Sequence, residues 1–247
     1  MRVGLPRNKM VEVFKKIQSF LPSGIGVLYE DNHLLVVTKP AGMPVQGDES
    51  GDDSLLDLCK LYIKEKYHKP GAVFLGLVHR LDRPVSGVVV FARTSKAASR
   101  LSEQFRAHST VKKYLAICQG VPKKAGVLKD YLIRQERHSV VSRNQEGKLA
   151  ELSFDVRATH QDTALLEIIL KTGRHHQIRV QFSSRGYSLL GDFRYGSKIK
   201  FPNRSLALHA YMLEINHPTQ KNRMCFVASP ATSWGYQSEI TQIVGKY

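Results

Sequence analysis

The chain has 247 residues, 42% hydrophobic and 23% charged, which is typical of a folded globular protein and excludes global disorder. It carries 37 Lys and Arg against 21 Asp and Glu, a formal net charge of +16, which favours a polyanion partner, nucleic acid ahead of an acidic membrane. The three cysteines, Cys59, Cys118 and Cys225, form no C-x-x-C pair, so zinc and a disulfide framework lack support. Without a spanning apolar stretch or a secretion signal, we expect a cytoplasmic protein with free thiols.

Residues 1–22 are predicted to form an amphipathic helix that docks on the rest of the chain. Apolar side chains recur there at helical spacing, and lysines occupy the other face: Met10, Val13, Phe14, Ile17 and Leu21 against Lys9, Lys15 and Lys16. Pro22 ends the pattern. The remaining residues, 23–247, are predicted to form one domain.

The first half of that domain alternates between short strands and helices. Residues 27–44 are predicted to form a strand, a turn at Asp31-Asn32, a second strand and then a loop. Ser54 begins a helix that ends before Pro70-Gly71. Two more apolar runs, 73–78 and 88–91, are predicted as buried strands, and a helix over 96–107 follows its cap at Thr94-Ser95.

The second half is dominated by strands. Strands are predicted over residues 112–120, 151–158 and 164–170, and residues 121–148 as hairpins or a mobile insert. Short connections predict antiparallel pairing between successive strands. A helix is predicted within residues 172–182, after the turn at Gly173. Together these elements indicate an α+β fold with a mixed, mostly antiparallel sheet and helices at its sides.

The turn between the two central strands carries the first candidate site. Asp82 lies there between Arg80 and Arg83, and Pro84 and Gly87 stiffen the backbone. An isolated Asp between arginines is most simply a surface ion pair. An acid on a stiff loop between two core strands is also a suitable catalytic group.

The second candidate site is the segment Gly173-Arg174-His175-His176. Gly173 and the free N–H groups at a helix start suit an anion, as do Arg174 and Arg179. The adjacent histidines His175 and His176 also suggest a metal site. We reject it, because neighbours on a helix diverge and no third ligand is suitably spaced.

Several of these stretches, taken together, resemble the RluA-type pseudouridine synthase family. His79-Arg80-Leu81-Asp82 with Ser86-Gly87 resembles its H-R-L-D-x-x-T-S-G signature, with Val85 in place of the usual Thr. Residues 173–196 resemble its G-R-x-H-Q-I-R … G-D-x-x-Y-G block, with Ser188 in place of a Pro. The resemblance extends in order from about residue 27 to about residue 230, and includes the Lys39-Pro40 opening motif and the L-H-A and H-P elements at residues 208–218.

The resemblance implies that uridine is isomerised to pseudouridine in structured RNA, ribosomal or transfer, by one catalytic aspartate acting on a flipped base. It implies catalytic roles for Asp82, Tyr114 and Arg179, and substrate-binding roles for Arg80, His79, Arg174 and Lys39. It also implies a central RNA-binding cleft across the sheet. The reaction requires no cofactor or metal.

The resemblance also bears on domain organisation and partners. Many relatives carry a separate RNA-binding domain before the catalytic one, and we expect none here, with residues 23–247 as the catalytic domain. We expect a monomer that binds RNA, with no membrane and no obligate protein partner.

Three alternative functions remain to be weighed. A non-catalytic RNA-binding protein on the same scaffold is one, against which the intact set of Asp82, Tyr114 and Arg179 argues. A kinase catalytic loop is another, but Leu81 interrupts its H-R-D order and Gly87 stands where its Asn is required. Glycoside hydrolysis would require a second carboxylate, which we cannot locate.

Overall fold

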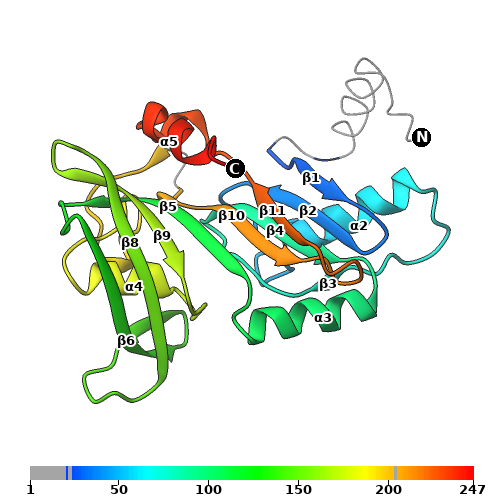
Figure 1. Ribbon diagram of the computed structural model, residues 1–247, viewed down its shortest axis with the longest axis horizontal. Helices are drawn as coiled ribbons and strands as arrows, with labels where there is room; N and C mark the ends of the chain where they lie inside the picture. Colours follow the sequence, from blue (N-terminus) through cyan, green and yellow to red (C-terminus); the bar gives the residue numbers. More distant parts are fainter. Residues whose placement is uncertain (1–20, 22–23, 203–204) are drawn as a thin grey trace.

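A computed structural model describes residue 21 and residues 24–202 and 205–247 of the chain (Figure 1). The helix predicted over residues 1–22 lies outside these residues, except for Leu21. The described strands are β1 Val27–Glu30, β2 Leu34–Lys39, β3 Gly76–Leu77, β4 Ser86–Ala92, β5 Val111–Gln119, β6 Ala125–Gln135, β7 His138–Val141, β8 Lys148–His160, β9 Thr163–Leu170, β10 Leu208–Asn216 and β11 Arg223–Val227. The described helices are α2 Leu55–Lys66, α3 Ser95–Arg106, α4 Gln177–Ser183 and α5 Gln237–Val244, with short 3-10 turns η1 Phe193–Tyr195 and η3 Thr232–Trp234.

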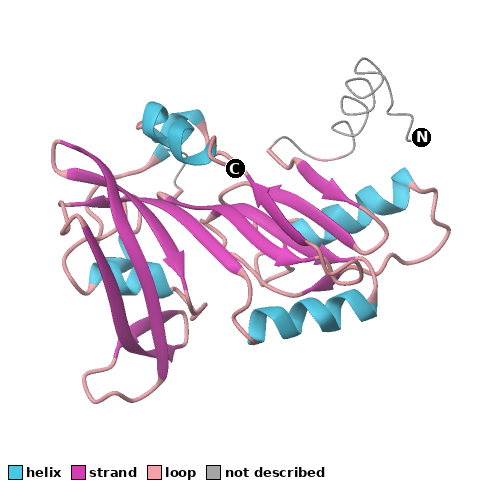
Figure 2. Cartoon of the chain, viewed as in Figure 1, coloured by secondary structure: helices cyan, strands magenta, loops and turns pink. Residues whose placement is uncertain are grey.

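The described strands form one sheet (Figure 2). Their order in it is β1-β2-β4-β10-β5-β9-β8-β6-β7, with β3 on β4 and β11 on β10. All pairings are antiparallel except that of β4 with β10, where Ser86 and Gly87 face His209 and Ala210. The prediction of a mixed, mostly antiparallel sheet with flanking helices is therefore confirmed.

The parallel contact between β4 and β10 requires glycine at position 87. Gly87 has φ +129°, and a Cβ atom there would lie 2.3 Å from the carbonyl oxygen of Ala210. The backbones of the two strands thus approach each other closely at the point where the loop that carries Asp82 leads into β4. This close approach fixes the end of the loop that carries Asp82.

Strands β2 and β4 are buried on both faces, which explains their continuous apolar sequence. One face packs on α2 through Leu35, Val37, Val89, Phe91, Leu55 and Tyr62. The other packs on α3 through Leu34, Val36, Val88, Val90, Ala97 and Leu101. Both helices begin at a predicted cap, since Ser54 accepts from the Asp57 N–H and Thr94 from the Ala97 N–H. The Asp82 loop therefore projects from strands that are buried on both faces.

Two predicted elements differ from the structure in extent. The run 73–78 yields only the two-residue strand β3, which pairs with Phe91 and Ala92, and Phe74 before it is exposed. The helix predicted within 172–182 begins only at Gln177, because His176 has φ +54° and ends the preceding turn in the left-handed region. Residues 173–176 are consequently a loop.

The β5-β9-β8-β6-β7 half of the sheet curls around α4 (Figure 1). The segment predicted as hairpins, residues 121–148, forms the β6–β7 hairpin, with Gln135 facing His138 beside the turn. Among the described helices, none is long and apolar enough to cross a membrane. The hairpin brings Ser139 to the edge of the Asp82 site.

Candidate active site

The loop that carries Asp82 is held by the core below it and by the neighbouring loop. Leu81 and Val85 are buried in the core, and the Val85 N–H donates to the Asp82 carbonyl at 3.0 Å. The Gly42 N–H donates to the Arg83 carbonyl at 2.8 Å. Val85, which stands where the family has Thr, packs its methyl groups in this core. The carboxyl group of Asp82 is thereby presented from a fixed backbone.

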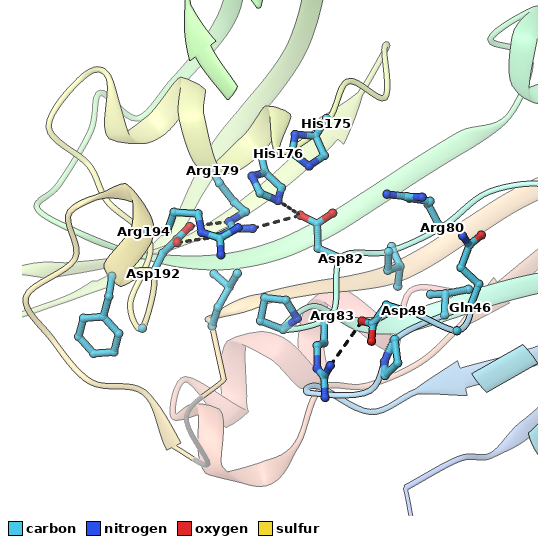
Figure 3. Close-up of a pocket in the computed structure, with 18 residues that line it drawn as sticks. Gln46, Asp48, Arg80, Asp82, Arg83, His175, His176, Arg179, Asp192 and Arg194 are labelled. Atoms are coloured by element: carbon cyan, nitrogen blue, oxygen red, sulfur yellow. Dashed lines mark hydrogen bonds and ion pairs between the residues drawn. The ribbon is translucent and has the colours of Figure 1, made fainter. Parts of the chain in front are cut away.

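The Asp82 carboxylate points toward two buried nitrogen groups (Figure 3). Arg179 Nη1 and His176 Nε2 each lie 3.3 Å from Asp82 Oδ2. The Asp82 side chain is 25% exposed, whereas those of Arg179 and His176 are 6% exposed. The acid therefore stands at the boundary between a buried polar cluster and solvent.

Arg179 reaches Asp82 from α4 and is held by a second acid. Its Nε donates to Asp192 Oδ2 at 2.7 Å and its Nη2 to Asp192 Oδ1 at 2.8 Å. Its guanidinium also lies over the Tyr195 ring, 5.0 Å from the centroid. Burial by itself would lower the pKa of Arg179, but the hydrogen bonds and charge of Asp192, with those of Asp82, raise it. The guanidinium is a fixed cation beside Asp82.

The two adjacent histidines stack rather than diverge. Their rings lie 3.7 Å apart, because both precede α4 in a loop, so the helical argument against a metal site was wrong in its geometry. His176 Nδ1 lies 2.9 Å from Tyr195 Oη, and His175 Nδ1 lies 3.0 Å from Ser139 Oγ. Within the described ranges, no group of three or more His, Cys, Asp or Glu side chains is placed to hold a metal.

Tyr114, on β5, lies with Asp82 and Arg179 in one hollow. This hollow has a volume of about 300 Å³ and is also lined by Leu81, Val85, Leu170, Ile178 and Leu208. Burial raises the pKa of Tyr114, and the negative charge of Asp82 raises it further, so the phenol stays protonated. Asp82 therefore faces a hollow whose walls combine these apolar side chains and one phenol with polar groups such as Arg134, Arg174 and Gln177, which suits a flat, partly polar ligand.

Two of the predicted substrate-binding arginines lie at the same site. Arg80 is exposed and borders both this hollow and a second one of about 470 Å³ on the other side of Asp82. Arg174 borders the Tyr114 hollow, and its Nε donates to the Leu149 carbonyl at 2.8 Å. Both guanidiniums are placed at the rim, where a polyanion can reach them.

Lys39 supports the Asp82 loop from below. Its Nζ donates to the carbonyls of Pro40, Met43 and Arg83 at 2.9, 2.7 and 3.0 Å, and the side chain is buried. Burial lowers the pKa of Lys39 to about 7, although the charge of Asp82 opposes this shift. These three bonds use all the donors of an ammonium group. The predicted contact of Lys39 with substrate stays a prediction.

His79 is likewise engaged by the protein itself. Its Nε2 accepts from the Val90 N–H at 3.0 Å, and its ring stacks on Phe105 at 4.7 Å. Burial lowers the pKa of His79 to about 3, with a further contribution from the charge of Lys112. The ring also borders a shallow hollow beside Arg80 and Arg174. Its substrate-binding role stays a prediction as well.

Asp192, Tyr195 and Ser139 complete the site and were not identified as site residues from the sequence. Asp192 and Tyr195 lie in the G-D-x-x-Y-G stretch, so a signal for them was present in the matched block. Ser139 carries no such signal, and only the fold of the β6–β7 hairpin brings it here. His176 was considered only as a metal ligand.

Three comparisons bear on this site. The family model described as RNA pseudouridylate synthase matches residues 33–184. The chain is 35% identical over 215 residues to the ribosomal large subunit pseudouridine synthase C of Buchnera aphidicola subsp. Schizaphis graminum, an alignment that covers 82% of this chain and 66% of that protein. It is 36% identical to the ribosomal large subunit pseudouridine synthase D of Zymomonas mobilis, with 82% and 68% covered. The chain thus spans about two thirds of the length of these relatives.

A solved structure shares the fold. "Human RNA Pseudouridylate Synthase Domain Containing 4" superposes with a TM-score of 0.73 at 24% identity, covering 97% of this chain and 98% of that one. This agreement concerns the arrangement of strands and helices. The matched family segment contains Asp82, Tyr114, His176 and Arg179, while Asp192 and Tyr195 follow shortly after it.

Proposed function

Since the chain belongs to the RluA-type RNA pseudouridylate synthase family, we propose that it isomerises uridine to pseudouridine in ribosomal RNA. The observation that carries the proposal is the Asp82 carboxylate, 3.3 Å from Arg179 and open to the Tyr114 hollow, within the segment that the family model matches. Ribosomal RNA is favoured over transfer RNA because the curated relatives are ribosomal large subunit enzymes.

The proposed reaction exchanges one bond for another. The bond from uracil N1 to sugar C1′ breaks, the base turns within the hollow, and C5 bonds to C1′. The C5 proton then leaves to solvent and N1 takes up a proton, so the product is an isomer of uridine. Nothing is oxidised or hydrolysed, so the chemistry requires no cofactor. Asp82 acts as a nucleophile at C1′ or as the base that begins elimination at the sugar. The guanidinium of Arg179 lies 3.3 Å from its Oδ2 and would fix its orientation.

The hollow around Tyr114 would retain the detached uracil. Its apolar side chains would pack against the base and limit the access of water to the sugar. Tyr114, a protonated phenol in this setting, packs against the base and can exchange a proton near C5. Arg179 would hold Asp82 throughout and is proposed as the third catalytic residue.

RNA would reach this site by its charge and by base flipping. The net charge of +16 attracts the phosphate backbone. A stacked uridine cannot reach Asp82 and must be extruded, which costs a few kcal/mol. Arg80, exposed at the rim, is suited to stack in the vacated position, and Arg174 to bind phosphate. We propose a monomeric cytoplasmic enzyme that acts without a protein partner.

Replacing Asp82 tests the proposal. RNA from cells that lack the gene, complemented with wild type, Asp82→Asn or the exposed control Asp53→Asn, is mapped by carbodiimide treatment and primer extension. We expect the pseudouridine signal at the target position with wild type and Asp53→Asn, and its loss with Asp82→Asn. A normal pseudouridine signal with Asp82→Asn would contradict the catalytic assignment of Asp82. If the wild-type protein binds RNA but gives no pseudouridine signal, a non-catalytic RNA-binding protein is favoured. Mapping transfer RNA from the same cells decides between the two substrate classes.

A further inference from the structure

We infer that His176 is a positioning residue for Asp82: its Nε2 carries the proton and lies 3.3 Å from Oδ2, so that His176 and Arg179 together face that oxygen and leave Oδ1 for the sugar. This inference rests on the proposed function for its catalytic consequence. Its structural part, the proton on Nε2 of a neutral imidazole, stands independently of any activity.

Both contacts to the carboxylate converge on a single oxygen. Arg179 Nη1 and His176 Nε2 are each 3.3 Å from Oδ2, and no described residue donates a hydrogen bond to Oδ1. A carboxylate held at one oxygen by two groups from different directions cannot rotate freely about its Cβ–Cγ bond. Oδ1 is therefore the oxygen available to attack C1′ or to take a proton.

The hydrogen bonds behind His176 determine where its proton lies. The Ser139 N–H donates to Tyr195 Oη at 2.8 Å, so this oxygen already accepts one bond. The Tyr195 hydroxyl proton then has two acceptors, His176 Nδ1 at 2.9 Å and the Ser139 carbonyl at 3.3 Å. The shorter contact favours donation to Nδ1. An imidazole that accepts at Nδ1 carries its proton on Nε2, which faces Asp82.

The charge state of the ring agrees with this tautomer. Burial lowers the pKa of His176 to about 2, and the charge of Arg179 acts in the same direction, so the ring is neutral at physiological pH. The alternative neutral tautomer would aim the Nε2 lone pair at the Asp82 carboxylate and leave two acceptors facing each other. The Nε2–H form alone satisfies Asp82, His176 and Tyr195 together.

His175 provides an internal contrast. It stacks on His176, but its Nδ1 contacts Ser139 Oγ, and among the described residues it forms no hydrogen bond or ion pair with Asp82. The two rings therefore have different roles: His176 contacts Asp82, whereas His175 covers the ring of His176. The positioning role belongs to His176 alone.

Substitution of His176 tests the catalytic consequence. The probe is a large-subunit ribosomal RNA transcript carrying 5-tritiated uridine, which releases tritium when C5 bonds to the sugar. We expect His176→Leu to lower the single-turnover rate about 10- to 100-fold, the equivalent of a lost hydrogen bond to a charged group, with RNA affinity unchanged. His176→Gln, whose amide can reach Oδ2, should restore most of the rate. The exposed control His160→Gln should match wild type.

Nitrogen NMR of the imidazole-labelled full-length protein tests the tautomer without RNA. The imidazole resonances of His176 are assigned by their absence from the spectrum of His176→Gln. Near neutral pH we expect them to show a protonated Nε2 and an unprotonated Nδ1. Tyr195→Phe, which removes the donor to Nδ1, should weaken that preference. A proton on Nδ1, a charged ring, or full activity of His176→Leu would overturn the inference. A wild-type protein that releases no tritium would instead overturn the proposed function, and the NMR result would still decide the tautomer.

Discussion

Asp192 binds the guanidinium of Arg179 through both of its carboxylate oxygens, at 2.7 Å to Nε and 2.8 Å to Nη2. Both side chains are almost fully buried, with 6% of Arg179 and 2% of Asp192 exposed. This pairing leaves one nitrogen, Nη1, directed at Asp82. Asp192 therefore fixes the orientation of Arg179, and its negative charge offsets part of the positive charge that acts on Asp82.

Replacing Asp192 should destabilise the protein strongly. Asp192→Asn leaves the buried Arg179 charge without its bidentate partner, and breaking such a pair from one side costs about 3–5 kcal/mol. Urea unfolding followed by circular dichroism measures the change. The control is Glu214→Gln, because Glu214 pairs with Arg223 at the surface, with 27% and 36% of the two side chains exposed. That change should cost about 0–1 kcal/mol. Equal costs for the two variants would show that the Asp192 pair does not support the fold.

The elements that the sequence predicted well are those set by neighbouring residues. The caps at Ser54 and Thr94 and the turn at Asp31-Asn32 are local, and all three lie where the pattern placed them. The start of α4 was misplaced because His176 has a left-handed backbone conformation, and its partners Tyr195 and Asp82 lie far from it in sequence, so no local pattern contains them. Strand β3 was overestimated because only Gly76 and Leu77 of its apolar run pair with β4, and Phe74 in that run is exposed.

The residues of the site also divide into those that the sequence indicated and those that it did not. Asp82, Tyr114 and Arg179 could be nominated because they match a family pattern, and the fold brings them to one hollow. The bond between Asp192 and Arg179 joins α4 to a loop 13 residues further along the chain, and sequence alone did not predict it. For Lys39 the sequence left a structural role and a substrate contact equally open, and an isolated lysine at the end of a strand gives no indication of three carbonyl partners.

Loss of the Lys39 amino group should loosen the Asp82 loop. Lys39→Met keeps the aliphatic stem but leaves the carbonyls of Pro40, Met43 and Arg83 without their donor. We expect a loss of about 1–3 kcal/mol in unfolding free energy and a lower single-turnover rate, because the Arg83 carbonyl adjoins Asp82. Lys60→Met, at an exposed site, is the control. If Lys39→Met unfolds at the same urea concentration as the control, the supporting role is wrong.

Alanine at position 87 should not be accommodated. Its Cβ would lie 2.3 Å from the Ala210 carbonyl oxygen, so β4 and β10 would have to separate. The control is Gly51→Ala, since Gly51 also has positive φ, +75°, but has nothing within 4 Å of the added atom. Strain alone should cost Gly51→Ala about 1–2 kcal/mol. We expect Gly87→Ala to cost clearly more by thermal unfolding, and similar melting temperatures would contradict the close approach.

The stability of the protein should fall in mild acid because buried histidines are held neutral. His209 is 3% exposed, its Nδ1 lies 2.8 Å from Ser86 Oγ, and its Nε2 lies 2.9 Å from the Ala228 carbonyl. That carbonyl can only accept, so the proton lies on Nε2 and Nδ1 accepts from Ser86. Burial lowers the pKa of His209 to about 4, partly opposed by the Ala228 bond, from an ordinary value of 6.5. Between these values the unfolded chain binds a proton that the folded protein does not.

The contribution of His209 is therefore fully present above pH 6.5 and is lost progressively as the pH falls from 6.5 toward 4. The slope from one such group approaches about 1.4 kcal/mol per pH unit in the middle of that window. His209→Gln cannot titrate, so the dependence of its unfolding free energy on pH should be shallower than that of wild type by up to this amount. The measurement is urea unfolding at several values from neutral pH to pH 5, comparing slopes rather than absolute stabilities, because the substitution itself is expected to destabilise. Parallel slopes for wild type and His209→Gln would mean that His209 already binds its proton in the folded protein.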